Sequence, residues 1–364
     1  MRGLEPLGCD PGRRPEPRAR MDVLRPDPDR EARAAVAPEP ALAPHGHRRF
    51  AWIGTAASLL IFAASLYVLW RVGREVDPAE VRRAFTAASA GQIGAAAGLT
   101  AISYLLLTGY DALALRQLGV RVPYRTTALG SFASYAVSFT LGFPLVTGGA
   151  VRYRIYAPKG VGPGRIASLT VIAGLTFWLG MGAVLAFSLI REAGPLAVMV
   201  YTSIRTNQAA GLAAAVVVAG YLAWVAAKRR AVRVRGWRLE LPGLRLSLAQ
   251  MLIGAADACV GAGVLYVLLP PGHGIAYETF LGVYVFAVML GIASHAPGGL
   301  GVFEATVLLA LSSMPREPVL GALLLFRLIY YIAPFVLALA LLGAYEVAGR
   351  LKPARAVLHA EDEG

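Results

Sequence analysis

The sequence has few charged residues and almost no cysteine. Charged side chains make up 16% of its 364 residues and hydrophobic side chains 57%, a composition too apolar for a soluble protein of this size. The two cysteines are Cys9, in a polar segment, and Cys259, in an apolar run. No disulfide or zinc framework can therefore be assigned from their positions.

The sequence also lacks the common signatures of enzyme chemistry. It contains no Gly-x-x-x-x-Gly-Lys-Ser/Thr phosphate loop, no Gly-x-Ser-x-Gly nucleophile elbow and no His/Cys cluster at metal-ligand spacing. Each of these motifs would place a nucleophile, a metal ion or a phosphate at a fixed point of a fold. We therefore expect neither a cofactor nor a metal ion, and the sequence favours a protein that is not an enzyme. His295, a lone histidine, is predicted to be a hydrogen-bonded structural residue.

Long apolar runs are abundant, and each is long enough to cross the hydrocarbon core of a membrane. They predict an all-α polytopic integral membrane protein with about eight transmembrane helices and a re-entrant or broken segment near residues 129–156. The crossings are predicted at 52–70, 93–115, 166–190, 209–227, 248–269, 280–294, 302–311 and 319–348.

The chain divides into three regions by composition. Residues 1–48 are rich in Pro, Arg, Ala and acidic residues and are typical of a disordered tail. Residues 49–350 form the membrane domain, and 351–364 form a short cytoplasmic tail. The first apolar run is long and has no small-residue cleavage pattern, so it predicts a retained span and not a signal peptide. Met21 offers an alternative start of translation.

Basic residues are concentrated in one loop. The formal net charge is +13, and the loop 228–245 carries seven Lys or Arg against Glu240 alone. Between two apolar runs, such a loop is better explained by the positive-inside rule and anionic headgroups than by nucleic-acid binding. The loop 270–278 contains no Lys or Arg and is placed outside. With 129–146 re-entrant, both termini are then cytoplasmic, in the cell (inner) membrane.

Helix-breaking residues interrupt two apolar segments. Paired Gly/Pro-interrupted segments in the two halves of a transporter indicate a binding site near the membrane midplane. A third break is expected where Pro334 follows Tyr330 and Tyr331, since proline kinks a helix. The candidate hinge residues are Pro144, Gly148 and Gly149 in the first segment, Pro297, Gly298, Gly299 and Gly301 in the second, and Pro334.

Eight side chains in or beside the apolar runs are candidates for substrate binding. A charged side chain at membrane depth costs about 2.5–3.5 kcal/mol even on a lenient insertion scale, so it needs a partner or a function. The candidates are Asp111, Arg152, Tyr153, Arg154, Asp257, Glu304, Arg327 and Tyr330.

The acidic candidates each have a structural alternative. Asp111 lies near the end of its run, where an interfacial position fits as well as a functional one. Asp257 lies well inside its run and must pair, be protonated or line a cavity. Glu304 stands five residues after Gly299, where the helix dipole can stabilise a carboxylate.

The basic candidates also allow two interpretations. Arg152 and Arg154 follow a Gly-Gly break, so they form either a fork for a lipid phosphate or a positive-inside anchor. Arg327 either pairs with Glu304 or contacts the substrate directly.

Three ordered motifs carry a resemblance to a known family. They are GGAVRYRIY at 148–156, PGGLGVFE at 297–304 and RLIYYIAP at 327–334, and over roughly residues 50–350 the chain resembles the transmembrane domain of the lysylphosphatidylglycerol flippase/synthetase family. In that family the membrane domain moves an aminoacylated phospholipid to the outer leaflet, and a separate cytosolic domain makes it. The resemblance implies that Asp111, Arg152 and Glu304 sit in or beside motifs that match the family's polar intramembrane positions, whereas Asp257 has weaker motif support.

The resemblance leaves two classes of function. The first is a flippase that translocates an aminoacylated or other phospholipid, with phospholipids and the membrane as its partners. The second is a membrane component of aminoacyl-phospholipid synthesis, acting as the enzyme or beside a separate synthase. The chain ends at Gly364, so we expect no synthetase domain.

Overall fold

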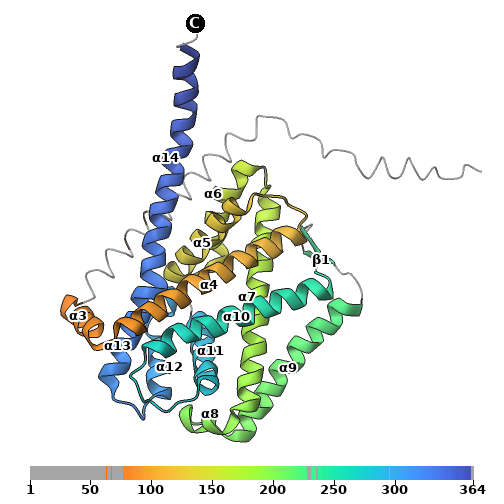
Figure 1. Cartoon of the computed structure of the whole chain (residues 1–364). Helices are drawn as coiled ribbons and strands as arrows, with labels where there is room; N and C mark the ends of the chain where they lie inside the picture. The colour runs from red at the N-terminus through yellow and green to blue at the C-terminus, as the bar shows by residue number, and fades with distance from the viewer. Residues whose placement is uncertain are drawn as a thin grey trace, which may run out of the picture. The chain divides into compact units, whose positions relative to one another are not determined.

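The computed structural model describes residues 77–227, 231–234, 237–240, 242–294 and 296–361, together with Ala63 and Tyr67. The predicted tail at 1–48, the start at Met21 and His295 lie outside the described residues, as does nearly all of the first crossing at 52–70. The described residues are mostly helical, which confirms the all-α class (Figure 1).

The element bounds follow the chain from α3 to α14. The helices are α3 (Pro78–Ala87), α4 (Ala90–Gln117), α5 (Tyr124–Leu141), α6 (Pro144–Tyr156), α7 (Pro163–Arg191), α8 (Ala193–Met199), α9 (Ile204–Ala227), α10 (Leu244–Leu268), α11 (Tyr277–Ala293), α12 (Val302–Ala310), α13 (Arg316–Phe326) and α14 (Ala333–Glu361). Short turns η1 (Ala157–Lys159) and η2 (Pro297–Gly299) and the π-helical η3 (Arg327–Ile332) connect some of them. In the basic loop, β1 (Ala231–Val234) and β2 (Trp237–Glu240) form an antiparallel hairpin.

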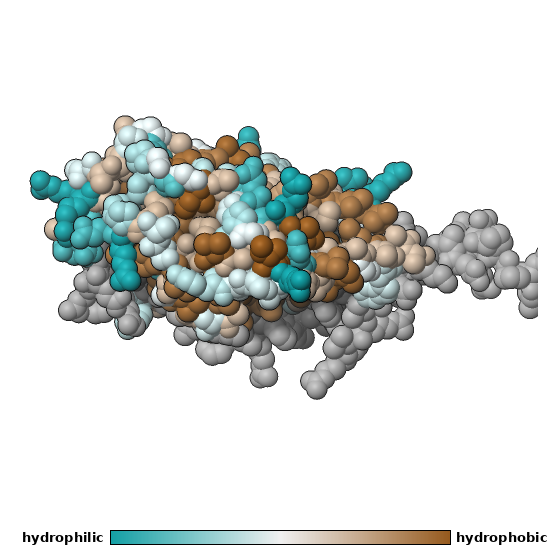
Figure 2. All heavy atoms as spheres, turned by 90° about the horizontal axis from the view of Figure 1, so that it is seen from below, coloured by the Kyte–Doolittle hydropathy of each residue, from teal (hydrophilic) through white to brown (hydrophobic). Residues whose placement is uncertain are grey.

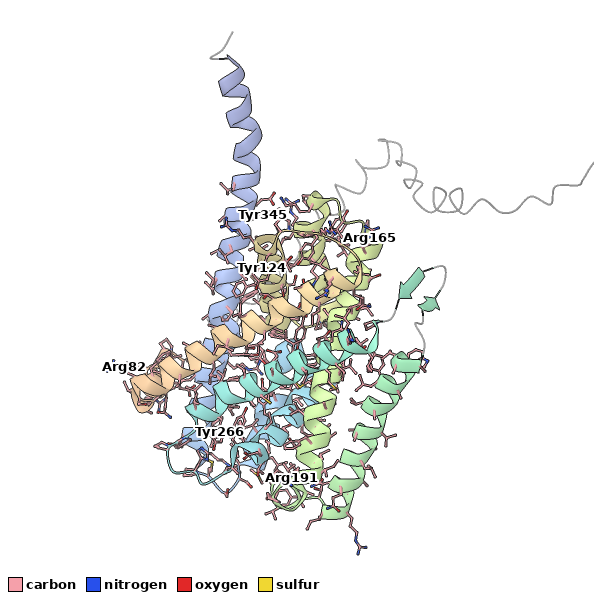
Figure 3. The ribbon with its side chains drawn as sticks, turned by 45° about the vertical axis from the view of Figure 1, so that its right-hand side comes forward. Arg82, Tyr124, Arg165, Arg191, Tyr266 and Tyr345 are labelled. Carbon is pink, nitrogen blue, oxygen red and sulfur yellow. The ribbon has the colours of Figure 1, made fainter. Side chains whose placement is uncertain are left out.

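Five described helical segments are long and apolar enough to cross a membrane. They are α4, α7, α9, α10 and the continuous α13–η3–α14 segment, and α11 is a shorter apolar helix. Arg165 and Arg191 lie near opposite ends of α7, and Tyr124 and Tyr345 share the end of the bundle that holds Arg165 (Figure 3). Charged and aromatic side chains at the ends of apolar helices are typical of the two membrane interfaces. The protein is therefore a multi-pass membrane protein.

A predicted crossing is absent at 302–311. Helix α12 has nine residues, which span only about 14 Å at 1.5 Å per residue, whereas the hydrocarbon core is about 30 Å thick. Helix α12 instead folds back along α11. The break between them at 294–301 makes α11 and α12 a second helical hairpin, which corrects the prediction of a full span.

The first broken segment is also a helical hairpin. Helix α5 ends at Leu141, and Gly142 and Phe143 take positive φ angles of 79° and 49° before α6 begins at Pro144. Proline is favoured at the first position of a helix because its missing N–H has no partner there anyway. The break predicted within 129–156 is thus confirmed, and α5 and α6 pack side by side.

Local sequence fixes where α4 begins. Ser89 and Gln92 form a capping box, in which the Ser89 hydroxyl accepts from the Gln92 amide and the Gln92 side chain accepts from the Ser89 amide. The Gln92 amide group also donates to the carbonyls of Val267 and Leu269 at 3.0 and 3.1 Å. One residue therefore starts α4 and ties it to the end of α10.

Helices α7 and α10 touch through their backbones. A Cβ atom added to Gly180 of α7 would lie 2.2 Å from the carbonyl carbon of Gly254 of α10. No side chain fits at that distance, so the crossing requires glycine at Gly180. The close crossing places α10 in the middle of the bundle, against α4, α7 and α11.

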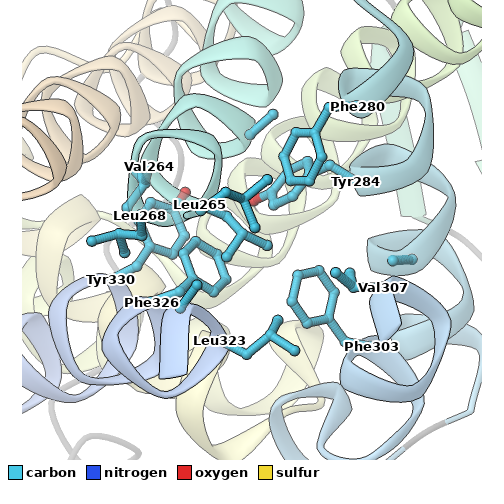
Figure 4. Packing of buried hydrophobic residues seen from close by; sticks show 14 of the residues in the cluster. Val264, Leu265, Leu268, Phe280, Tyr284, Phe303, Val307, Leu323, Phe326 and Tyr330 are labelled. Atoms are coloured by element: carbon cyan, nitrogen blue, oxygen red, sulfur yellow. The ribbon is translucent and has the colours of Figure 1, made fainter. Parts of the chain in front are cut away.

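Two large hydrophobic clusters fill the interior. The first surrounds Tyr284, Phe303, Phe326 and Tyr330 (Figure 4), where Phe326 stacks on Phe303 and Tyr330 with ring centroids 5.6 and 5.2 Å away. The second joins α4, α5, α6, α7 and α14. Apolar side chains also reach the surface, where they appear as brown patches among charged residues (Figure 2), as a lipid-facing protein requires.

Candidate functional site

The two helical hairpins meet at their breaks. A Cβ atom on Gly298, in the second break, would lie 3.0 Å from the carbonyl oxygen of Phe139 and 3.3 Å from that of Thr140, near the end of α5. Gly298 also has a φ of 59°, a conformation that glycine adopts without steric cost. The second break therefore contacts the last turn of α5, immediately before the first break, and surrounding protein or a cavity must satisfy the polar groups of this irregular backbone.

A cavity of about 920 Å³ adjoins this meeting point. Its size is within the range of small-molecule sites. It is bounded by one face of α3, the start of α4, the ends of α5 and α10, the second break, and one face of α13 and η3. Its polar and break-region lining includes Glu80, Arg83, Gln92, Phe139, Thr140, Gly298, Glu304, Glu317, Arg327 and Tyr331.

Glu304 and Arg327 form an ion pair in the cavity wall. Arg327 Nε donates to Glu304 Oε1 at 2.5 Å, and Arg327 Nη1 donates to the carbonyl of Gly298 at 2.7 Å. Glu304 Oε2 accepts from the backbone N–H of Gly301 at 2.8 Å. Glu304 therefore caps α12 with one oxygen and holds Arg327 with the other. The position of the carboxylate at a helix start and its pairing with Arg327 were both among the alternatives drawn from the sequence.

Arg327 retains an unused donor. Its Nη2 lies 2.5 Å from the same Glu304 Oε1, but it is not aligned for a hydrogen bond and has no other partner. The guanidinium lies over the rings of Tyr331 and Phe303, 4.7 and 5.5 Å from their centroids, an arrangement that favours a cation. Arg327 is thus fixed in place by Glu304, the Gly298 carbonyl and two rings, with Nη2 buried inside the ion pair.

Asp111 and Arg152 form a second ion pair, which is fully buried. Arg152 donates to both carboxylate oxygens of Asp111 at 2.8 to 3.2 Å, and the side chains are 0% and 4% exposed. The Tyr156 hydroxyl adds a bond to Asp111 at 2.9 Å, and the Tyr135 ring lies 4.9 Å from the guanidinium carbon. This pair attaches α6 to α4, and it does not line the cavity.

Arg154 and Tyr153 lie apart from Arg152. Arg154 pairs with Glu346 of α14, and both side chains are about one-third exposed. Tyr153 is half-buried and packs against the second hydrophobic cluster. The structure therefore does not join Arg152 and Arg154 into one fork.

Asp257 belongs to a third polar cluster. Its carboxylate accepts from the hydroxyl of Ser103 at 2.6 Å and from that of Tyr110 at 3.1 Å. The Ser103 hydroxyl also bonds to that of Tyr330 at 2.8 Å. The cluster thereby connects the candidates Asp257 and Tyr330, whereas Ser103 and Tyr110 were not identified from sequence. Tyr110 could have been suspected because it precedes the candidate Asp111 in the chain. Nothing in the sequence around Ser103 marks it as part of a polar cluster.

Seven of the hinge candidates occupy the two breaks or their flanks, whereas Pro334 lies in the continuous α13–η3–α14 segment, where the expected break is absent and a π-helical turn, η3, precedes the proline. Pro334 has no N–H for the Tyr330 carbonyl four residues earlier, and the Tyr104 hydroxyl donates to that carbonyl at 3.3 Å. The others lie at the first turns of α6 and around the second break. Pro144 begins α6, Gly148 lies beside Ser138 and Arg152, Gly149 lies near Thr170, Pro297, Gly298 and Gly299 form η2, and Gly301 precedes α12.

Helix α3 also lines the cavity and was not predicted from the sequence. It carries Arg83 and Ala84 on the cavity wall and packs along α13. The start of α3 follows ordinary capping rules. The Asp77 side chain accepts from the Ala79 amide at 2.8 Å, and Pro78 is the first residue of the helix. That cap was the signal that could have located the helix.

Two helical hairpins that meet beside a cavity, within a bundle of long apolar helices, define a multi-pass membrane protein. Residues 55–338 match the family described as the lysylphosphatidylglycerol synthase TM region, which covers most of the chain. The chain therefore belongs to this family, as the sequence motifs indicated.

Relatives of similar length support the assignment. The chain is 34% identical to an uncharacterized protein of Synechocystis sp., slr0712, over 75% of the chain and 85% of the relative. It is 32% identical to the inner membrane protein YbhN of Escherichia coli, over 80% of the chain and 92% of that protein. A shorter match, 40% identical over 25% of the chain, is to the phosphatidylglycerol lysyltransferase of Staphylococcus haemolyticus, of which it covers 11%.

Proposed function

We propose that this protein translocates a phospholipid, such as an aminoacylated one, between membrane leaflets, and that the headgroup binds in the cavity. The single observation that carries the proposal is the Glu304–Arg327 pair, which lies in the cavity wall where the two broken hairpins meet. Charged side chains at membrane depth are typical of substrate pathways. A lipid translocase needs such a polar site because a headgroup cannot cross the hydrocarbon core unaided.

The chemistry of the pair fits a headgroup that carries both signs of charge. Arg327 supplies a guanidinium that binds a phosphate oxygen once Glu304 releases it, since a guanidinium binds phosphate well. Glu304 offers a carboxylate for an amine. Since the pair neutralises itself when the cavity is empty, a headgroup with a phosphate and an amine can replace both partners without leaving an uncompensated charge.

The cavity supports an orientation as well. Pro270 and Pro271 line it, and they belong to the loop without Lys or Arg that the charge rule places outside. The first hairpin and the basic β1–β2 loop then lie on the cytoplasmic side of the inner membrane, with both termini. In this proposal the cavity opens outward, and the α5–α6 hairpin closes the inner side.

The buried Asp111–Arg152 pair has a different role in this scheme. Both of its partners are already satisfied, so it does not serve as a free phosphate fork. It holds α6 against α4, and Arg154 holds α6 against Glu346 of α14. We assign these two contacts to the inner closure, which must separate for the cavity to open to the cytoplasm.

Transport into liposomes tests the proposal. The purified chain is reconstituted with a fluorescent phospholipid, and dithionite quenching follows its appearance in the outer leaflet. We expect Glu304→Gln and Arg327→Gln to lose translocation, whereas Glu278→Gln, which removes an exposed carboxylate outside the cavity lining, retains it. Equal rates for all four proteins, or no movement by the wild type with any headgroup, would contradict the proposal.

The match to a lysyltransferase favours one alternative, a membrane subunit for lipid synthesis by a separate synthase. Lipid mass spectrometry of cells with and without the gene separates the two. A lost lipid species supports synthesis, and an altered leaflet distribution at constant total lipid supports translocation.

A further inference from the structure

Asp257 is a buried carboxylate with no cationic partner among the described residues. It is 4% exposed and lies on α10 in the centre of the bundle, yet the described ion pairs use Asp111, Glu304 and Glu346 instead. Its partners are two neutral hydroxyls. An ionised carboxylate without a cation is costly in such surroundings, and a proton removes the cost.

A chain of hydroxyl groups leads away from Asp257. Ser103 lies between the carboxylate, at 2.6 Å, and the Tyr330 hydroxyl, at 2.8 Å. When Asp257 is ionised, Tyr330 donates to Ser103 and Ser103 donates to Asp257. When Asp257 carries a proton, it donates to Ser103, and Ser103 donates to Tyr330. The oxygen atoms keep their positions in both states, and only the donors and acceptors of the two hydrogen bonds along this chain of hydroxyls are exchanged.

The chain ends next to the cavity. Tyr330 lies in the π-helical η3 between residues that line the cavity, and its neighbour Tyr331 is one of them. Its ring stacks on Phe139, which also lines the cavity, with centroids 6.4 Å apart. The Tyr330 ring therefore packs directly behind Phe139 and Tyr331 of the cavity wall. π-helical turns frequently occur at functional sites.

We propose that Asp257 is a proton-binding site that exchanges with the cavity through Ser103 and Tyr330 and couples lipid movement to the proton gradient. When the Phe139 and Tyr331 rings move apart, water from the cavity reaches the Tyr330 oxygen and gives it a proton while Tyr330 passes its own proton to Ser103. Ser103 passes its proton to Asp257, and the carboxylate becomes a carboxylic acid. One proton enters, and each hydroxyl ends with one proton. This inference rests on the proposed function for its coupling step.

No charged group faces Asp257 from the described elements packed around it. From α7 the carbonyl oxygen of Thr176 approaches α10, where it would lie 2.5 Å from a Cβ atom on Gly254. Arg152 approaches Tyr135 and is neutralised by Asp111. The titratable groups that interact with Asp257 are Tyr104 and Tyr110 of α4, Tyr135 of α5, Tyr284 of α11 and Tyr330 of η3.

Infrared difference spectra between acid and alkaline buffer test the proton site directly. We expect a band from a protonated carboxyl group that the wild type gains in acid and Asp257→Asn lacks, while Glu278→Gln retains it. Tyr330→Phe should slow its appearance, whereas Tyr104→Phe should not, since among the described residues the Tyr104 hydroxyl donates to a backbone carbonyl and takes no place in the hydroxyl chain. A pH-dependent spectrum that is identical in wild type and Asp257→Asn would overturn the site.

The coupling is tested in the liposome assay with an imposed pH gradient. We expect the gradient to accelerate lipid movement by the wild type and Tyr104→Phe, and to have no effect on Asp257→Asn or Tyr330→Phe. Lipid movement that ignores the gradient in the wild type would overturn the coupling and leave the lipid function standing. No lipid movement under any gradient would remove the lipid function and the coupling, and the infrared band alone would then decide the proton site.

Discussion

Arg152 of α6 binds Asp111 of α4 through both carboxylate oxygens, although 41 residues separate them in the chain. Both side chains are almost completely buried, and Tyr156 completes the hydrogen bonding of the carboxylate. The pair thus links the first broken hairpin to a long transmembrane helix.

Removal of one partner should destabilise the fold strongly. Asp111→Ala or Arg152→Ala leaves an uncompensated buried charge, which costs about 3–5 kcal/mol. The double variant should lose less than the sum of the two single losses, with a coupling energy of about 0.5–3 kcal/mol. Thermal unfolding in detergent measures this, and Arg125→Ala, an exposed arginine on α5, is the control. Strictly additive losses would show that the pair is not coupled.

The α7–α10 crossing should not tolerate a methyl group. In Gly180→Ala the new Cβ would lie 2.2 Å from the Gly254 backbone, so we expect a loss of about 1–3 kcal/mol from overpacking. Gly174→Ala on the same helix is the matched control, since nothing lies within 4 Å of its Cβ position. It should stabilise the helix by up to about 1 kcal/mol. Chemical denaturation compares the two, and equal effects would refute the close crossing.

The orientation can be tested by labelling single cysteines in whole cells. In a background where Cys9 and Cys259 are replaced by alanine, Pro271→Cys should react with a membrane-impermeant maleimide from outside. Lys159→Cys, at the opposite end of the bundle, should react only after the membrane is permeabilised. The physical basis is the asymmetry of Lys and Arg between the two sides. The reverse pattern would invert the topology and the direction in which the cavity opens.

The sequence predicted the transmembrane helices well because their signal is local. The runs at 93–115 and 209–227 correspond to α4 at Ala90–Gln117 and α9 at Ile204–Ala227. The ends differ by a few residues because polar caps such as Ser89 and Gln92 extend a helix beyond its apolar run. The breaks at 142–149 and 297–301 were also predicted, since Pro and Gly act through their own backbone geometry.

The prediction at 302–311 was wrong for a physical reason. Hydropathy records that a segment is apolar and does not record what surrounds it. Phe303 and Val307 are 2% and 0% exposed because other helices cover them, so α12 is a short arm of a hairpin within the bundle. An apolar segment buried in protein and one that faces lipid have the same composition.

The candidate site was only partly readable from sequence. Polar residues in apolar runs stand out because burial of a charge is costly, so Asp111, Asp257 and Glu304 were found one by one. Their partners depend on which helices pack together, and a hydroxyl such as that of Ser103, 154 residues from Asp257 in the chain, carries no signal of its own.

The sequence by itself determined that this is a helical membrane protein with two broken segments, because helix length, hydropathy and backbone geometry are properties of neighbouring residues. It also determined the family. The tertiary structure decided that the breaks meet, that Glu304 and Arg327 line a cavity, that Arg152 is buried against Asp111, and that a hydroxyl chain reaches Asp257. Each of these depends on contacts between distant parts of the chain, which only packing of the helices establishes.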